Sequence, residues 1–140
     1  MIRNYQNSDL DTLMQIWLEG NLDAHDFVDP SYWQDNYELV KKELPNAHLY
    51  VDEEDGEIAG FVGMQGDYIA GIFVKSDYRG RGIGGKMIDF LKQKHDRLQL
   101  SVYEKNEAVF NFYQKHGFRL VKKDIDQETG AVDCLMEWHA

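Results

Sequence analysis

An apolar stripe near the start of the chain has the spacing of an amphipathic helix, i, i+3, i+4, i+7 and i+8. Its members are Leu10, Leu13, Met14, Trp17 and Leu18. The preceding Ser8–Asp11 segment resembles a capping box. A second helix is predicted to begin with Asp29 as its N-cap and Pro30 as its first residue, and to end near Pro45.

Apolar runs with strand-like patterns follow. Two runs flank Asp55-Gly56 within residues 47–64, which predicts a hairpin. A third run, residues 68–74, leads into a glycine-rich turn, and the apolar spacing after this turn predicts a helix. Residues 98–102 predict a short strand.

The C-terminal part of the chain continues the alternation of helices and strands. Asn106 can cap a helix that ends at Gly117. Residues 117–123 and 131–138 then predict an antiparallel pair with a turn between them. This order of elements predicts one mixed α/β domain over residues 1–140.

Composition limits the classes of protein that need to be considered. No stretch approaches the ~18 apolar residues of a membrane span, and the first residues lack an apolar signal core. Cys134 is the only cysteine, so an internal disulfide and a CxxC metal site are both excluded. We expect Cys134 to be a buried structural thiol and the chain to be cytoplasmic.

The charge of the chain is unevenly distributed. The net charge of −10 argues against nucleic acid as the main partner. Residues 1–70 contain 15 Asp or Glu against 3 Lys or Arg, whereas residues 71–140 contain 10 against 12. This is either an acidic surface that aids solubility or a division of roles, with a cation attracted by the first half and an anion bound by the second.

The glycine-rich turn fits two phosphate-binding templates imperfectly. As a P-loop it has Met87 where a Ser or Thr would bind Mg²⁺, so that reading fails. As a dinucleotide fingerprint it has Gly80, Gly82 and Gly85, with Glu104 near the position of a ribose-binding acid. About half of the chain precedes the turn, which disfavours this second reading.

A phosphate held by backbone N–H groups at a helix N-terminus is the interpretation that remains. Arg79 and Arg81 would assist the backbone, and the dipole and glycines suit a pyrophosphate. Residues 79–84, "RGRGIG", resemble the Q/R-x-x-G-x-G/A acyl-CoA pyrophosphate loop of the GNAT superfamily of N-acetyltransferases. Residues 106–118, "NEAVFNFYQKHGF", resemble the N-x-x-A/V-x-x-F-Y-x-x-x-G-F signature of the same superfamily.

The resemblance covers nearly the whole chain and is greatest to small, stand-alone bacterial members. It implies a mixed, mostly antiparallel sheet flanked by about four helices, with a splayed central strand pair that binds acyl-CoA. Acetyl-CoA is then the cosubstrate. The cofactor-binding residues that it implies are Ile72, Phe73, Val74, Arg79, Gly80, Arg81, Gly82, Ile83, Gly84 and Asn106.

Catalysis in this family requires a neutral amine, a polarised thioester carbonyl and a proton for the leaving thiolate. The resemblance implies that a backbone N–H near Phe73 polarises the carbonyl and that Tyr113 is the general acid. A packed core aromatic is the alternative for Tyr113. The general base stays open, with Asp67, Tyr68, His25 and a water chain as candidates.

Acceptor specificity is expected to lie in the first two helices and their loop. The residues predicted to bind the acceptor are His25, Phe27, Tyr32 and Tyr68, although a lone loop histidine is more often solvated surface. A cationic amine is favoured, either a small amine or a peptide N-terminus or lysine. We expect no metal, no membrane or nucleic acid partner, and a monomer or homodimer. The alternative function is a non-catalytic acyl-CoA-binding regulatory module.

Overall fold

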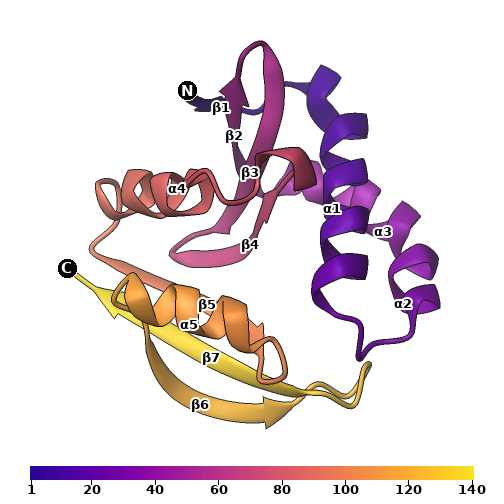
Figure 1. Cartoon of the computed structure of the whole chain (residues 1–140), viewed down its shortest axis with the longest axis vertical. Coiled ribbons are helices and arrows are strands. Elements are labelled where there is room, and N and C mark those ends of the chain that lie inside the picture. Colours follow the sequence, from indigo (N-terminus) through magenta and orange to yellow (C-terminus); the bar gives the residue numbers. More distant parts are fainter.

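The protein, described over all of residues 1–140 by a computed structural model, is built on one seven-stranded sheet (Figure 1). Its strands are β1 (Ile2–Asn4), β2 (His48–Glu54), β3 (Glu57–Gln65), β4 (Tyr68–Val74), β5 (Arg97–Tyr103), β6 (Arg119–Ile125) and β7 (Val132–His139). Their order across the sheet is β1-β2-β3-β4-β5-β7-β6. Only β4 and β5 are parallel; all other neighbours are antiparallel. This confirms the predicted mixed α/β architecture.

Five α-helices flank the sheet, one more than expected: α1 (Leu10–Ala24), α2 (Pro30–Asp35), α3 (Tyr37–Glu43), α4 (Ile83–Lys92) and α5 (Glu107–Lys115). The predicted cap of α2 is present, because the Asp29 carboxylate accepts a hydrogen bond from Ser31 N at 3.0 Å. The single helix expected from there to Pro45 is instead divided at Asn36. The Asn36 side chain donates to the Tyr32 carbonyl at 2.6 Å, and such local bonds compete with the helical ladder.

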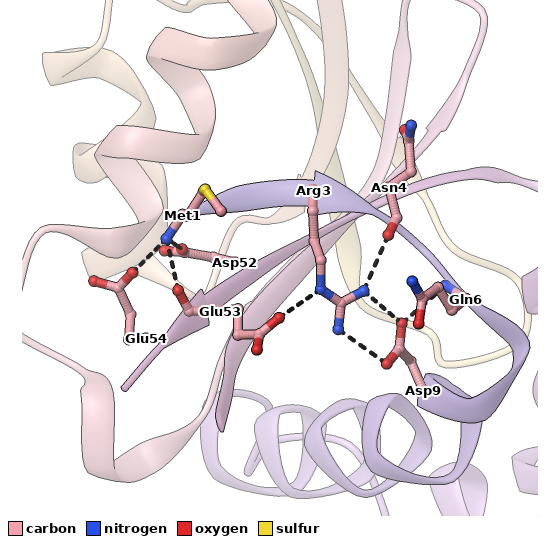
Figure 2. Close-up of polar contacts among 8 residues, drawn as sticks. All are labelled: Met1, Arg3, Asn4, Gln6, Asp9, Asp52, Glu53 and Glu54. Atoms are coloured by element: carbon pink, nitrogen blue, oxygen red, sulfur yellow. Dashed lines mark hydrogen bonds and ion pairs between the residues drawn. The ribbon is translucent and has the colours of Figure 1, made fainter. Parts of the chain in front are cut away.

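The start of α1 differs from the predicted capping box at Ser8–Asp11. α1 follows a 3-10 turn over Asn7–Asp9, and no side chain caps it. Instead, Asp9 accepts a hydrogen bond from the backbone N–H of Gln6 at 2.8 Å. Arg3 of β1 also donates to both oxygens of the same carboxylate, at 2.9 and 3.1 Å (Figure 2). Asp9 therefore joins β1 to the start of α1.

Strand β1 is too short for the apolar pattern to predict. Its three residues pair with β2. Arg3 Nε lies 2.6 Å from Glu53 Oε2, and the Met1 ammonium lies 3.0 Å from Asp52 Oδ1 and 2.7 Å from Glu54 Oε2 (Figure 2). These charge pairs attach β1 to the end of β2.

The sheet separates two apolar cores, one on each face. Leu49 and Val51 of β2 pack with α1 and α2. Tyr50, between them, packs in the core that contains α4 and α5, as the two-residue period of a strand requires. Figure 1 shows α1, α2 and α3 grouped together, apart from α4 and α5. None of the helices combines the length and apolar character needed to span a membrane.

Candidate active site

The two central strands, β4 and β5, separate along their length. They form two parallel pairs, Tyr68 with Gln99 and Ile69 with Leu100, and no further pairs although both strands continue. The backbone groups of residues 70–74 that point toward β5 therefore have no partner strand. Figure 1 shows the two strands diverging, so the predicted splayed pair is present.

A cavity of about 640 Å³ occupies this opening. Its wall includes residues 71–74 of β4, residues 101–103 of β5, the C-terminal part of α1, and α5. Because α1 and α5 belong to the cores on opposite faces of the sheet, the cavity reaches both faces. Two reactants can therefore approach from opposite sides and meet between the strands.

Tyr113 of α5 lines this cavity and is 7% exposed. Its ring packs edge-on against Phe112 and Phe118, with centroid separations of 5.2 and 5.6 Å. Burial raises the pKa of Tyr113 above the usual value for tyrosine, so the hydroxyl keeps its proton at neutral pH. The two interpretations of this residue are compatible, because the ring packs in the core while the residue borders the cavity.

The glycine-rich turn leads directly into α4. Gly80 and Gly82 have φ values of 79° and 78°, a region that disfavours other residues, and Gly82 is the N-cap of α4. A Cβ at either glycine would meet no atom within 4 Å, so the turn is open on its outer side. A Cβ at Gly84, in contrast, would lie 3.2 Å from the Phe112 ring. The Ile83 side chain is buried in the core, which leaves only its backbone available to a ligand.

The two arginines of the turn have different surroundings. Arg79 lines the cavity, where its Nη1 lies 3.3 Å from Asp23 Oδ2 and its Nε donates to the Val74 carbonyl at 3.3 Å. The Arg81 guanidinium lies over the Tyr78 ring, 5.0 Å from its centroid, outside the cavity wall. An open turn with backbone N–H groups at the start of a ten-residue helix, and with Arg79 beside it, fits the pyrophosphate of acetyl-CoA.

His25 follows the end of α1 and lines the cavity between two amide side chains. Its Nδ1 lies 3.1 Å from Asn21 Oδ1, and its Nε2 lies 3.4 Å from Asn106 Nδ2. This arrangement fits a neutral ring that carries hydrogen on Nδ1. Burial lowers the pKa of His25, which also favours the neutral form. Asn106 occupies the N-cap position of α5 as predicted, but its side chain contacts His25 and forms no hydrogen bond with the helix.

The other three residues predicted to bind the acceptor lie around the cavity and are not part of its wall. Phe27 packs edge-on against His25, with ring centroids 5.7 Å apart. The Tyr32 hydroxyl donates to Glu128 Oε2 at 2.7 Å, which connects α2 to the turn between β6 and β7. Tyr68 lies where β4 and β5 are still paired.

Two carboxylates that sequence analysis did not single out line the cavity: Asp23 and Asp133. Asp23 is paired with arginine as described above, whereas Asp133 has no ion pair and no side-chain partner, and only the adjacent backbone N–H of Cys134 acts on its carboxylate as a donor. Burial, and then the nearby Asp126, raise the pKa of Asp133. Asp67, one of the candidate bases, lies outside the wall and contacts His95 Nδ1 at 2.9 Å.

Comparison with known proteins identifies the family. Residues 45–120 match the family described as the acetyltransferase (GNAT) domain. The chain is 39% identical to the peptidyl-lysine N-acetyltransferase YiaC of Escherichia coli (strain K12), over 99% of this chain and 96% of that protein. It is 30% identical to the peptidyl-lysine N-acetyltransferase YjaB of the same organism, over 92% and 88%. The solution structure of apo-form YjaB from Escherichia coli has a TM-score of 0.88, at 26% identity, over 99% of this chain and 96% of that one.

The chain therefore belongs to the GNAT family of acetyltransferases. It is an N-acetyltransferase that transfers an acetyl group from acetyl-CoA to an amine. Neither the relatives nor the site favours the alternative of a non-catalytic acyl-CoA-binding module.

Proposed function

We propose that the acceptor is the ε-amine of a lysine in a protein or peptide, and that the chain acts in the cytoplasm. The cavity that reaches both faces of the sheet carries this proposal, because it lets an acceptor enter from the α1 side while acetyl-CoA binds on the other. A lysine has a long apolar stem and a terminal amine, so its amine can reach into the opening between β4 and β5. The names of the relatives YiaC and YjaB as peptidyl-lysine N-acetyltransferases support the same acceptor.

Acetyl-CoA supplies an acetyl group that is already activated as a thioester. The backbone of residues 80–84, with Arg79 and more peripherally Arg81, would hold the pyrophosphate. The unpaired edge of residues 72–74 would bind the pantetheine arm by backbone hydrogen bonds. The N–H near Phe73 would then polarise the thioester carbonyl.

Tyr113 would hold a proton for the departing sulfur, since a tyrosine hydroxyl is protonated at neutral pH; because burial raises its pKa, the transfer would depend on the position of the hydroxyl next to the sulfur. His25, Asn106 and Phe27 would shape the entrance on the acceptor side. Tyr32 and Tyr68 would act there less directly, because neither borders the cavity. A lysine amine is an ammonium at neutral pH, so it would first lose one proton to a base or to water, and its neutral nitrogen would then attack the thioester while Tyr113 protonates the leaving sulfur.

A comparison of three acceptors tests the proposed substrate, with release of the CoA thiol as the readout. The acceptors are an N-terminally blocked peptide with one lysine, a peptide with a free N-terminus and no lysine, and spermidine. We expect the highest kcat/KM for the lysine peptide. A higher kcat/KM for either of the others would overturn the proposed acceptor and leave the family assignment intact.

A matched pair of variants tests the donor side. Gly82→Asp places a carboxylate where the pyrophosphate is expected, at a φ that aspartate tolerates. Gly56→Asp is the control, because Gly56 has a φ of 79°, lies in the β2–β3 turn and is equally free of neighbours. We expect acetyl-CoA to raise the thermal midpoint of Gly56→Asp but not of Gly82→Asp. Equal stabilisation of the two would remove the turn from the donor site.

A further inference from the structure

Two carboxylates line the cavity, Asp23 and Asp133, and they differ in their partners. Asp23 is paired with Arg79 at 3.3 Å, and the two carboxylates near Asp133 also have partners, Asp124 with Lys122 and Asp126 with the Tyr103 hydroxyl. Asp133 borders the cavity, is partly buried, and has no ion pair and no side-chain partner, with only the backbone N–H of Cys134 beside its carboxylate. A carboxylate that lines an active-site cavity without a counter-charge is available to a cationic ligand.

The register of the sheet determines the face on which Asp133 lies. Asp133 of β7 is paired with Tyr103 of β5, so the two side chains share a face. The Tyr103 ring packs against His25 and Phe27, with centroids 5.0 and 5.4 Å apart. Asp133 is therefore on the α1 side of the sheet, whereas Tyr113 and α5 belong to the other face.

No positive charge within the cavity wall is free to balance Asp133. Arg79, the only Lys or Arg in the wall, is paired with Asp23. His25 is held neutral by its burial and its two amide contacts. Burial and Asp126 disfavour the charged form of Asp133, and an added cation would reverse that effect.

We propose that Asp133 determines the specificity for a cationic acceptor, with its carboxylate accepting a hydrogen bond from the ammonium group of the incoming lysine. The inference rests on the proposed lysine acceptor and assigns the recognition of its charge to β7. Hydrogen bonds between charged groups are stronger and shorter than neutral ones, which suits a contact that selects and orients the amine. Because this contact forms when the acceptor binds, its loss should act mainly on the KM of the acceptor.

Asp133→Asn tests the proposal, since it keeps the shape and one oxygen of the side chain but removes the charge. Asp124→Asn is the matched control, because Asp124 is the direct partner of Asp133 across β6 and β7 but lies outside the cavity wall. With the blocked lysine peptide, we expect Asp133→Asn to raise the acceptor KM about 10- to 100-fold. The KM of acetyl-CoA should not change, and Asp124→Asn should change the acceptor KM less than about twofold.

A second acceptor distinguishes recognition of charge from damage to the site. This acceptor is the same blocked peptide with an aminooxy group in place of the lysine ε-amine, and the aminooxy group is neutral at the pH of the assay. Asp133→Asn should leave the KM of the aminooxy peptide unchanged, whereas a structural defect would raise both values. An unchanged KM for the lysine peptide, or an equal rise for both peptides, would overturn the proposal.

The outcome for the wild type separates this inference from the proposed function. If the wild type acetylates spermidine and not the lysine peptide, the lysine proposal fails. The role of Asp133 is then decided by the KM of spermidine, compared between Asp133→Asn and Asp124→Asn. A wild type that acetylates neither cation overturns both proposals.

Discussion

Gly60 of β3 is the glycine whose replacement should be most informative about the donor side. A Cβ at this position would lie 2.5 Å from the carbonyl oxygen of Phe73 and 3.3 Å from Cα of Val74. An ordinary contact between carbon and a carbonyl oxygen is about 3.3 Å, so Gly60→Ala requires a shift of about 0.8 Å. The atom in the way is backbone of β4, the strand that we expect to bind the pantetheine arm.

Hydrogen bonding between β3 and β4 opposes this shift. Lys75 N donates to the Ala59 carbonyl at 2.7 Å, and Gly60 itself is paired with Val74, so β3 and β4 are tied together at this point. Overpacking of this kind costs about 1–3 kcal/mol, while replacing a strand glycine by alanine recovers roughly 0.5–1 kcal/mol of backbone entropy. The net loss in the free energy of unfolding is then at most about 2.5 kcal/mol, and about 1 kcal/mol at the centre of the two ranges.

Gly63→Ala is the matched control within the same strand. A Cβ there would lie 3.2 Å from Cδ2 of Leu49, the far end of a flexible side chain that can move. In this variant the cost of the tight contact and the gain in backbone entropy should nearly cancel, so the free energy of unfolding should stay within about 0.5 kcal/mol of the wild type.

The measurements are thermal unfolding and steady-state kinetics on both variants. For a chain of this length we expect Gly60→Ala to lower Tm by roughly 3–10 °C and to raise the KM of acetyl-CoA, with little change for Gly63→Ala. Equal Tm and equal KM in the two variants would refute the reasoning, because β3 and β4 would then be free to adjust.

Two further outcomes are expected. Tyr113→Phe should reduce kcat by about 10²-fold or more in steady-state kinetics. The KM of acetyl-CoA and the stability should change little, because the Tyr113 hydroxyl has no protein partner. An unchanged kcat would remove Tyr113 from the mechanism. Hydrogen bonds from Arg3 hold the pKa of Asp9 in the folded protein below its usual value. The ion pair therefore stabilises the fold fully above the pKa of Asp9 in the unfolded chain, about 3.9, and this stabilisation is lost as pH falls through the lower pKa of the folded state. Urea unfolding should show Asp9→Asn less stable than the wild type by about 1–3 kcal/mol at pH 7, with the difference shrinking below pH ~4; a difference that does not depend on pH would contradict the ion pair.

Local chemistry made much of the fold predictable. Asp55 and Gly56 have φ values of 53° and 79°, so the hairpin forms where an Asp-Gly pair predicts it. α4 begins directly after Gly82, where the glycine-rich turn predicts a helix start. The division of one expected helix at Asn36 was not predictable, since it depends on a side-chain hydrogen bond that competes with the helical one.

The proposed donor side has a stronger local signal in the sequence than the proposed acceptor side. Its residues lie in two continuous segments, 72–84 and 106–113, so short motifs describe them. The acceptor side depends instead on pairings between distant parts of the chain. β7 lies between β5 and β6 in the sheet, and this order brings Asp133 beside Tyr103 although thirty positions separate them. Neither residue has a local pattern that indicates this contact.

The acidity of residues 1–70 favoured a cationic acceptor but indicated no residue that would bind it. Asp52, Glu53 and Glu54 belong to that acidic half, yet they hold the start of the chain and Lys86 at the far end of β2. Within the cavity wall the same half supplies only Asp23, which is already paired. The unpaired carboxylate, Asp133, comes from the half with the positive balance. If Asp133 has the proposed role, recognition of a cation depends less on the total charge of a segment than on which carboxylate the sheet places in the opening without an ion pair.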